Sequence, residues 1–213
     1  MSPNKQFILL GPPGSGKGTQ AKFLAAKLRV PHISTGEIFR DHISRQTDLG
    51  KEVDNILKQG LLVSDDITNK IVADRLNQAD AVPGFVLDGY PRNLVQAAFL
   101  NESTMNVQAL DLELSDDEAV KRISRRWTCS VCGAIYHLDF KPPQNSGICD
   151  IDNTPLSQRS DQAENIVRDR LVIYHKQTEP LLAYYKREGR LIVIDGTPPI
   201  PQVTENINKV LQI

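Results

Sequence analysis

The chain has 213 residues, of which 40% are hydrophobic and 24% charged, which is typical of one folded globular domain and excludes a disordered chain. Its 25 lysines and arginines nearly balance 26 aspartates and glutamates, so overall charge gives no basis for binding nucleic acid or a membrane surface. The longest apolar runs are far shorter than the ~20 residues that span a bilayer, and the first residues do not resemble a signal peptide.

Short apolar runs alternate with longer helical patterns along the chain. We expect strands at residues 7–10, 32–34, 85–87, 109–114 and 191–194. We expect helices at residues 17–28, 36–43, 50–59, 65–77, 94–100, 116–126 and 164–186. This alternation predicts an α/β fold with a mostly parallel sheet. Residues 128–160 break the pattern, and we expect them to form a small insertion with its own fold.

A glycine-rich loop follows the first expected strand and precedes the first helix. Its sequence is GPPGSGKGT over residues 11–19. Glycines let backbone N–H groups surround phosphate oxygens, the helix N-terminus adds positive potential, and Lys17 can reach the β- and γ-phosphates. A ligand-free turn is the weaker alternative, so the loop predicts a nucleoside triphosphate site. One position departs from the usual motif: Gly18 stands where Ser or Thr normally follows the lysine, and Thr19 comes one residue later.

Two further segments indicate a second anion site rather than a regulatory GTPase. A GTPase would carry an N-K-x-D segment that reads guanine, and each Asn-Lys pair here continues differently. The sequence STGEIFR at residues 34–40 places Arg40 one turn into a helix, and FVLDGYPR at residues 85–92 ends a strand with Asp88 and a turn with Arg92. Arginines near a phosphate loop are typical of phosphoryl transfer, and Asp88 is placed to hold Mg²⁺ through water.

With these segments the chain resembles the adenylate kinase family over essentially its full length. The resemblance lies in residues 11–20, 34–40, 88–92, 96, 122–126, 159 and 170, and in the cysteine insertion. It implies a P-loop NTPase-type fold with a five-stranded parallel sheet. It also implies reversible transfer of the terminal phosphoryl group of Mg-ATP to AMP, giving two ADP, by a cytoplasmic monomer. One domain over residues 1–213 would carry an AMP-binding segment at 34–63 and a lid at 125–162.

The resemblance also implies the roles of individual residues. The ATP site would comprise Gly14, Ser15, Gly16, Lys17, Gly18, Thr19, Arg122, Arg126, Ile135, Tyr136 and Pro198. The AMP site would comprise Thr35, Gly36, Arg40, Leu61, Leu62, Val63, Gly89, Tyr90, Pro91, Arg92, Gln96, Arg159 and Arg170. Lys17, Arg92, Arg126, Arg159 and Arg170 would be catalytic. Two positions depart from the family pattern: Gln162 replaces the second acid of the usual pair, and Trp127 stands where arginine is common.

The insertion has the cysteine spacing of a metal site. Cys129 and Cys132 form one C-x-x-C pair, and Cys149 and Asp152 repeat that spacing. Zinc accepts thiolate and carboxylate ligands, and four protein ligands make a closed, structural site. Asp150 lies off this spacing, so we prefer Asp152 as the fourth ligand. Buried thiols without a metal are the alternative. A chain with such a site and no disulfide framework is expected in a reducing cytoplasm.

Two other functions fit parts of the sequence. The same architecture would serve a kinase for UMP, CMP or GMP. Only Thr35, Gln96 and their surroundings would distinguish these monophosphates from AMP. A zinc-ribbon module that binds nucleic acid or protein, with ATP as a switch, is less favoured. The insertion contains only Lys141 and Arg159 as cations, against three aspartates, which suits a phosphate backbone poorly. We therefore expect nucleotide partners, and neither nucleic acid nor a membrane.

Overall fold

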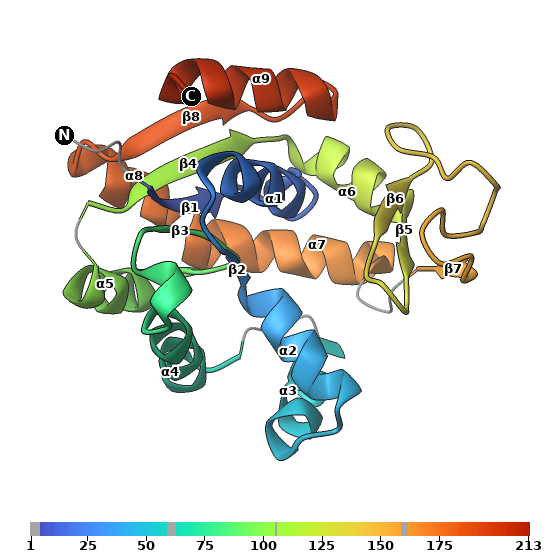
Figure 1. Ribbon diagram of the computed structural model, residues 1–213, viewed down its shortest axis with the longest axis horizontal. Coiled ribbons are helices and arrows are strands. Elements are labelled where there is room, and N and C mark those ends of the chain that lie inside the picture. Colours follow the sequence, from blue (N-terminus) through green and yellow to red (C-terminus); the bar gives the residue numbers. More distant parts are fainter. Residues whose placement is uncertain (1–4, 59–62, 105, 159–161) are drawn as a thin grey trace.

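The structure is a computed structural model that describes residues 5–58, 63–104, 106–158 and 162–213. Its centre is a five-stranded parallel sheet in the order β2-β3-β1-β4-β8 (Figure 1). The strands are β1 Gln6–Leu10, β2 His32–Ser34, β3 Phe85–Asp88, β4 Gln108–Glu113 and β8 Leu191–Asp195. Each expected strand is found within one residue at either end, and the predicted α/β fold is confirmed.

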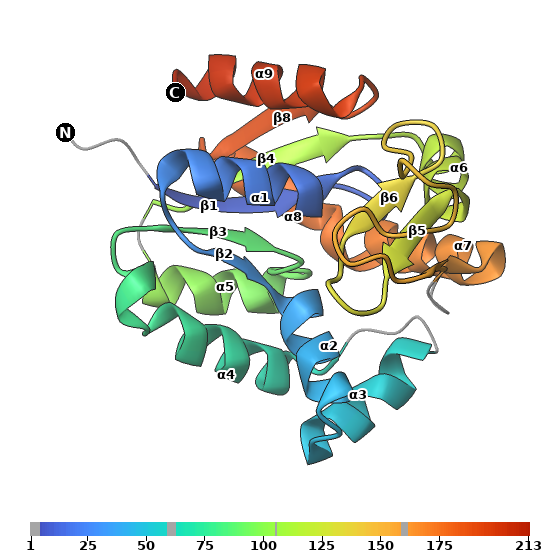
Figure 2. The same cartoon turned by 45° about the vertical axis from the view of Figure 1, so that its right-hand side comes forward.

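The sheet is buried on both faces, which explains the nearly continuous apolar runs of its strands. Along β1, Ile8 and Leu10 pack in the cluster that includes α5 Leu94–Ser103 and α8 Pro180–Arg187. Phe7 and Leu9 point to the other face and pack in the cluster that includes α1 Lys17–Leu28 and α9 Ile200–Leu211. Figure 2 shows α9 above β8 and α4 Asp65–Leu76 beside α5 below the sheet. Side-chain alternation thus assigns each strand residue to one helical layer.

Two groups of elements extend beyond this core. The first comprises α2 Thr35–Ser44 and α3 Asp48–Lys58, which project away from the sheet (Figure 1). Phe39, Val53 and Val63 form a separate apolar cluster there. Ser34 caps α2, since its hydroxyl accepts a hydrogen bond from the Glu37 backbone N at 3.4 Å. This segment therefore has its own small core.

The second group is the lid, which follows α6 Asp116–Ser124. Its strands are β5 Arg126–Cys129, β6 Ile135–His137 and β7 Leu156–Ser157, which form an antiparallel sheet in the order β6-β5-β7. Cys129, Tyr136, Cys149 and Leu156 are buried together between these strands and the loops. In Figure 2 the lid lies at the carboxyl end of the central strands, opposite α2 and α3.

Two expectations for the C-terminal part differ from the structure. The single helix expected over residues 164–186 is three elements: α7 Glu164–Ile173, a π-helix η3 Tyr174–Thr178, and α8. Pro180 has no N–H to continue α-helical hydrogen bonding, and the Glu179 N–H instead bonds to the Tyr174 carbonyl at 2.9 Å. The helix α9 was not expected, although Val203 and Ile207 have helical spacing and are buried.

Helix α6 ends at Ser124 rather than at Arg126, since Arg126 begins β5, and a 3₁₀-helix η1 spans Ala79–Ala81. None of the helices in the described ranges has both the length and the apolar character needed to cross a membrane.

Candidate active site

The glycine-rich loop connects β1 to α1 at the carboxyl edge of the sheet (Figures 1 and 2). Gly11, Gly14 and Gly16 have φ angles of 127°, 85° and 93°, which favour glycine. A Cβ at Gly11 would lie 2.5 Å from the Leu112 carbonyl oxygen, so the loop is pressed against β4. No side chain among the described residues caps α1 at Gly16. An uncapped helix N-terminus behind a glycine loop is suited to binding an anion.

Lys17 lies at the start of α1 and folds back over this loop. Its Nζ donates hydrogen bonds to the carbonyl oxygens of Gly11 at 2.7 Å and Pro12 at 2.8 Å. Loss of solvent lowers the pKa of Lys17 to about 8, and Arg92 and Arg170 lower it further while Asp88 and Asp111 oppose them. The lysine is therefore a cation in a site that already contains other cations, and an incoming phosphate would relieve that repulsion.

Asp88 ends β3 beside the loop. A Cβ at Gly18 would lie 3.0 Å from Asp88 Oδ2, so the departure from Ser or Thr at this position keeps space around the carboxylate. The Ser34 hydroxyl donates to the same oxygen at 3.5 Å. A carboxylate held at the loop in this way is compatible with water-mediated binding of Mg²⁺, which prefers oxygen partners and keeps several waters.

The turn after β3 positions Arg92. Gly89 has a φ angle of 78°, and its carbonyl accepts hydrogen bonds from Thr35 Oγ1 at 3.0 Å and Arg92 Nε at 2.8 Å. The following Tyr90–Pro91 peptide bond is cis. Loss of solvent lowers the pKa of Arg92 to about 10, and the nearby Arg170 and Arg40 add to this effect. The guanidinium lies over Gly89, since a Cβ at Gly89 would come within 3.2 Å of Arg92 Nη2, so the turn holds this arginine in a fixed position.

Gln96 is buried, and hydrogen bonds to several neighbours fix its position. Its Oε1 accepts from the Arg92 backbone N at 2.7 Å, and its Nε2 donates to Asp65 Oδ1 at 2.7 Å. The Asn93 side chain donates to the same Asp65 oxygen at 2.8 Å and caps α5 by accepting from the Gln96 backbone N. The sequence predicted a role for Gln96 but not for Asp65 or Asn93, because the three side chains meet only after α4 packs on α5.

Other predicted AMP-site residues lie around this turn. A Cβ at Gly36 would lie 3.1 Å from Arg40 Nη1, so the Arg40 guanidinium covers Gly36. Tyr90 is buried, and its hydroxyl donates to Asn69 Oδ1 at 2.7 Å. Val63 is buried in the cluster of α2 and α3. Leu61, Leu62 and Arg159 lie outside the described residues.

Arg170 on α7 interacts electrostatically with Lys17 and Arg92, and η3 contacts the backbone of Arg92. The guanidinium of Arg170 lowers the pKa of both Lys17 and Arg92. The Thr178 hydroxyl, at the end of η3, donates to the Arg92 carbonyl at 2.8 Å. The contact of Thr178 was not predicted from the sequence, because its position depends on the break between α7 and α8.

Arg122, near the end of α6, contacts the loop that follows β8. Its Nη1 donates to the Gly196 carbonyl at 2.9 Å and its Nη2 to the Thr197 carbonyl at 2.8 Å. Its guanidinium carbon lies 5.2 Å from the centre of the Phe140 ring. Pro198 directly follows these carbonyls, so the structure brings together two residues that the sequence assigned to the ATP site.

Arg126 begins β5 and contacts Gln162. With the Gln162 amide oriented to satisfy both groups, its oxygen accepts from Arg126 Nε at 2.9 Å and Nη2 at 3.2 Å, and its nitrogen donates to the Arg126 carbonyl at 3.1 Å. Gln162 is buried. A neutral amide thus contacts Arg126 from the position where the resemblance leads us to expect an acid.

Tyr136, on β6, faces the interior of the lid. Its hydroxyl accepts a hydrogen bond from the Asp150 backbone N at 2.8 Å and lies 3.5 Å from Cys149 Sγ. The neighbouring Ile135 is only partly buried. Any contact of Tyr136 with a nucleotide would therefore come from its backbone.

The three cysteines and Asp152 meet in the lid, with their ligand atoms all within 4.8 Å of one another. Cys132 Sγ lies 3.5 Å from Cys149 Sγ, and Cys129 Sγ lies 3.3 Å from Asp152 Oδ2. Two thiolates on one zinc ion, at Zn–S distances of ~2.3 Å in a tetrahedron, would be ~3.8 Å apart, so the residues present fit zinc. The Asp150 carboxylate instead accepts a hydrogen bond from the Gln144 backbone N at 2.8 Å.

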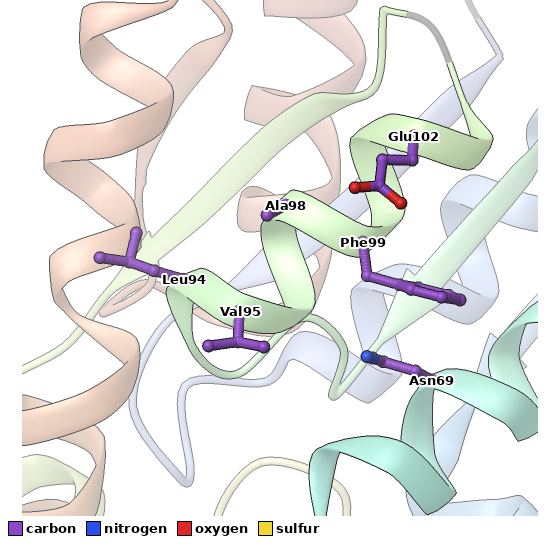
Figure 3. A pocket seen from close by; sticks show the side chains of 6 residues that line it. All are labelled: Asn69, Leu94, Val95, Ala98, Phe99 and Glu102. Atoms are coloured by element: carbon purple, nitrogen blue, oxygen red, sulfur yellow. The ribbon is translucent and has the colours of Figure 1, made fainter.

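A groove lies elsewhere, along α5 beside α4. It has a volume of about 500 Å³ and is lined by Asn69, Leu94, Val95, Ala98, Phe99 and Glu102 (Figure 3). Among the described residues that line the groove, Glu102 alone is charged, and its negative charge makes the groove unsuited to a phosphate. The polar and cationic groups that could bind nucleotides are instead gathered at the glycine loop.

Together, the parallel sheet, the glycine loop leading into α1, Lys17 and Asp88 define the class of P-loop nucleotide-binding proteins. Within that class, the sequence profile described as adenylate kinase matches residues 9–190. A protein named adenylate kinase from Acholeplasma laidlawii is 48% identical, with 97% of this chain and 98% of that protein covered. Adenylate kinases from Streptomyces avermitilis and Anaeromyxobacter sp. are 47% and 49% identical, covering 94% and 89% of this chain and 94% and 91% of theirs. The chain belongs to the adenylate kinase family.

Proposed function

We propose that this protein reversibly transfers the terminal phosphoryl group of Mg-ATP to AMP, giving two ADP. The observation that carries this proposal is the coupling of two anion sites: Lys17 of the loop and Arg92 of the β3 turn are close enough for Arg92 to lower the pKa of Lys17. Two phosphate-bearing ligands bound at these sites would meet end to end.

The reaction requires positioning and charge stabilisation rather than a general base. The bond between the γ-phosphorus and the β,γ-bridging oxygen of ATP breaks, and a bond forms between that phosphorus and an oxygen of the AMP phosphate, which is already ionised at neutral pH. Lys17, Arg92, Arg126, Arg159 and Arg170 would stabilise the negative charge on the transferring group. Exclusion of water by the lid would prevent hydrolysis.

The ATP and AMP sites would use the residues named from the sequence. The loop from Gly14 to Thr19 would bind the ATP phosphates, with Arg122, Ile135, Tyr136 and Pro198 near the base and lid. Thr35, Gly36, Arg40, Leu61, Leu62, Val63, Gly89, Tyr90, Pro91, Arg92 and Gln96 would bind AMP. The hydrogen bonds at Gly89 and Gln96 support this assignment, because they fix the Arg92 turn before a ligand arrives.

Two metals belong to the proposal. Mg²⁺ would arrive with ATP and be held by Asp88 through water, and it would supply positive charge at the β- and γ-phosphates. Zn²⁺ would occupy the site formed by Cys129, Cys132, Cys149 and Asp152 and hold the lid together, with no position left for a reactive water.

The proposed organisation is one domain with two attached parts, the AMP-binding segment at residues 34–63 and the lid at residues 125–162. Their separate apolar clusters support this division. We further propose a monomer in the cytoplasm, where the described thiols, which form no disulfide with one another, would stay reduced.

A coupled assay with Mg-ATP and each of AMP, UMP, CMP and GMP tests the function. We expect AMP to be the preferred acceptor, with two ADP formed for each AMP consumed. Faster turnover with another monophosphate would contradict the proposal. Omission of Mg²⁺ in the same assay tests its requirement.

A further inference from the structure

Asp111 is a buried acid that the proposed mechanism does not use. It is 2% exposed and lies on β4, paired in register with Leu10, the residue before the glycine loop. Its Oδ1 has no hydrogen-bond partner among the described residues. A buried carboxylate oxygen without a hydrogen bond destabilises a fold, so an acid at this position beside the loop requires an explanation.

The backbone brings Asp111 close to the base of Lys17. The Lys17 ammonium bonds to the Gly11 carbonyl at 2.7 Å. Gly11 in turn lies against the carbonyl of Leu112, the residue after Asp111. A Cβ at Gly11 would lie only 2.5 Å from that carbonyl oxygen. The lysine and the carboxylate are therefore linked through two directly packed backbone segments, β4 and the start of the loop.

The two acids near Lys17 lie on opposite faces of the sheet. Asp88 pairs in register with Leu9 and Asp111 with Leu10, and successive residues of a strand point to opposite faces. Asp88 is thus on the α1 side, where Mg-ATP would bind, and Asp111 is on the α8 side. Bound Mg²⁺ would neutralise the charge of Asp88, whereas Asp111 would keep its charge.

Charged groups from several of the described elements act on both Lys17 and Asp111. Arg92 and Arg170 lower the pKa of Lys17, and Asp88 and Asp111 raise it. The pKa of Asp111 is raised to about 6 by burial, Glu113 and Glu179, and Lys17 opposes this rise. The Tyr174 hydroxyl, on η3, also faces Asp111, whose charge raises the tyrosine pKa. At neutral pH Asp111 is therefore mostly ionised.

We propose that Asp111 is a positioning residue for Lys17, whose buried carboxylate keeps the ammonium protonated and held at the base of the loop until the nucleotide binds. This inference rests on the proposed function, in which Lys17 contacts the ATP phosphates. It explains why an acid, rather than an apolar side chain, is buried on β4.

The first test is the pH dependence of kcat/KM for ATP in Asp111→Asn, with Asp111→Glu and Glu113→Gln as comparisons. The alkaline limb of kcat/KM reports groups of the free enzyme. We expect Asp111→Asn to move this limb measurably to lower pH, since removal of a nearby opposite charge lowers the pKa of a lysine. Asp111→Glu should restore it, and Glu113→Gln, which removes an exposed acid on the same face, should leave it near wild type.

A limb that does not move in Asp111→Asn would overturn the proposal, as would an equal shift in Glu113→Gln. The melting temperature of Asp111→Asn supplies a second readout. Because the folded pKa of Asp111 is about 6 and its unfolded value is 3.8, the wild type loses stability as pH rises from about 4 to 6. We expect the variant to lack this loss and to melt at a higher temperature at pH 8.

The second test needs no variant of Asp111 and no turnover. The ε-carbons of lysine are labelled with ¹³C in the wild-type protein, and the Lys17 resonance is assigned by its absence in Lys17→Gln. We expect the Lys17 signal to show a step near pH 6, where Asp111 titrates, before its main transition near pH 8. Absence of the first step would overturn the proposal. A wild type that shows the step but does not phosphorylate AMP would contradict only the proposed function.

Discussion

Lys17 combines two properties that favour phosphate binding. It lies at the N-terminus of α1, and its ammonium group is desolvated. Its hydrogen bonds to the Gly11 and Pro12 carbonyls hold it over the loop in the absence of nucleotide. These carbonyls are weak partners compared with phosphate oxygens, because charge-assisted bonds between two ions are the stronger. Nucleotide binding would therefore move the ammonium from the loop to the phosphates.

We expect Lys17→Met to lower turnover by about two to three orders of magnitude, because one preorganised charged donor to the transferring group is lost. The matched control is Lys27→Met, which removes an exposed lysine from the last turn of the same helix and should leave turnover close to wild type. Steady-state assays with Mg-ATP and AMP measure both. Equal turnover in Lys17→Met and wild type would contradict the role of Lys17.

Individual site residues could be predicted from the sequence where they lie in one continuous segment of the chain. The loop from Gly11 to Thr19 and the turn from Asp88 to Arg92 are continuous, so their geometry follows from local rules for glycine, proline and helix ends. These local rules do not predict the contacts of Asp111 or Gln162. Their importance arises from strand register and from a contact across 36 residues of chain, between Arg126 and Gln162, neither of which appears in a linear pattern.

At the scale of elements, the lid is too small to rely on apolar burial. Its core cluster consists of four buried residues, Cys129, Tyr136, Cys149 and Leu156, and two of them are proposed metal ligands. Structural zinc sites contribute folding free energy directly. Stability of the lid and occupancy of its metal site should therefore rise and fall together.

We expect purified protein to carry one zinc per chain, and Asp152→Asn to lose most of it. The control is Asp150→Asn, since this neighbouring carboxylate bonds to the Gln144 backbone rather than to the cysteines. Metal analysis and melting temperature should change together, with Asp152→Asn and chelated wild type melting at lower temperature. Full zinc content in Asp152→Asn, or its loss only in Asp150→Asn, would refute the assignment of the fourth ligand.

The π-helix η3 is tied to α6 through His175. Its Nδ1 lies 3.0 Å from Glu179 Oε2, and its Nε2 lies 3.0 Å from Asp116 Oδ1. Both carboxylates raise the pKa of His175 above its ordinary value of 6.5. The folded state thus binds a proton more tightly than the unfolded state, so this stabilisation is complete below pH 6.5 and is lost as pH rises through the folded pKa.

We therefore expect His175→Gln to lower the free energy of unfolding at pH 5.5 but not at pH 9. The pair is 44% exposed at the histidine, so solvent screening limits the effect to about 0.5–1 kcal/mol. Denaturant unfolding at the two pH values measures it. His42→Gln is the control, because His42 contacts the Thr47 hydroxyl instead of a carboxylate. A loss of equal size at both pH values would contradict the charge argument.

Prediction of elements from the sequence succeeded for the strands of the central sheet, which helices cover on both faces. Strands β1 and β3 carry buried apolar residues on both faces, and each of the five strands was found within one residue of its expected ends. The break at η3 was not predicted, because the apolar spacing continues through Tyr174 and Leu181 while Pro180 alone interrupts the hydrogen bonding. Helix α9 was missed although the spacing of Val203 and Ile207 was visible in the sequence.

For the whole molecule, the near-neutral net charge hides a local concentration of cations. Lys17, Arg40, Arg92 and Arg170 come from α1, α2, the β3 turn and α7, and the electrostatic effects on Lys17 and Arg92 show that they act on one another. Parallel strands place all their carboxyl ends at one edge, so such segments converge there regardless of their distance along the chain. Asp88 offsets part of the repulsion among these cations in the free protein, and bound anions would offset more of it.

This predicts strong stabilisation by a dinucleotide in which two adenosines are joined through five phosphates, since it would place phosphates in both sites at once. At a free concentration one hundred times its Kd, the ligand should add about 2.7 kcal/mol to the free energy of unfolding. For a chain of this size that corresponds to a rise in Tm of roughly 5–10 °C. Arg92→Ala should weaken binding by at least about ten-fold, because a charged hydrogen-bond donor is lost. Arg168→Ala should not, because Arg168 pairs with Glu164 on the exposed face of α7. Calorimetry with the three proteins tests this, and equal affinity in Arg92→Ala and wild type would mean that the two sites do not act on one ligand.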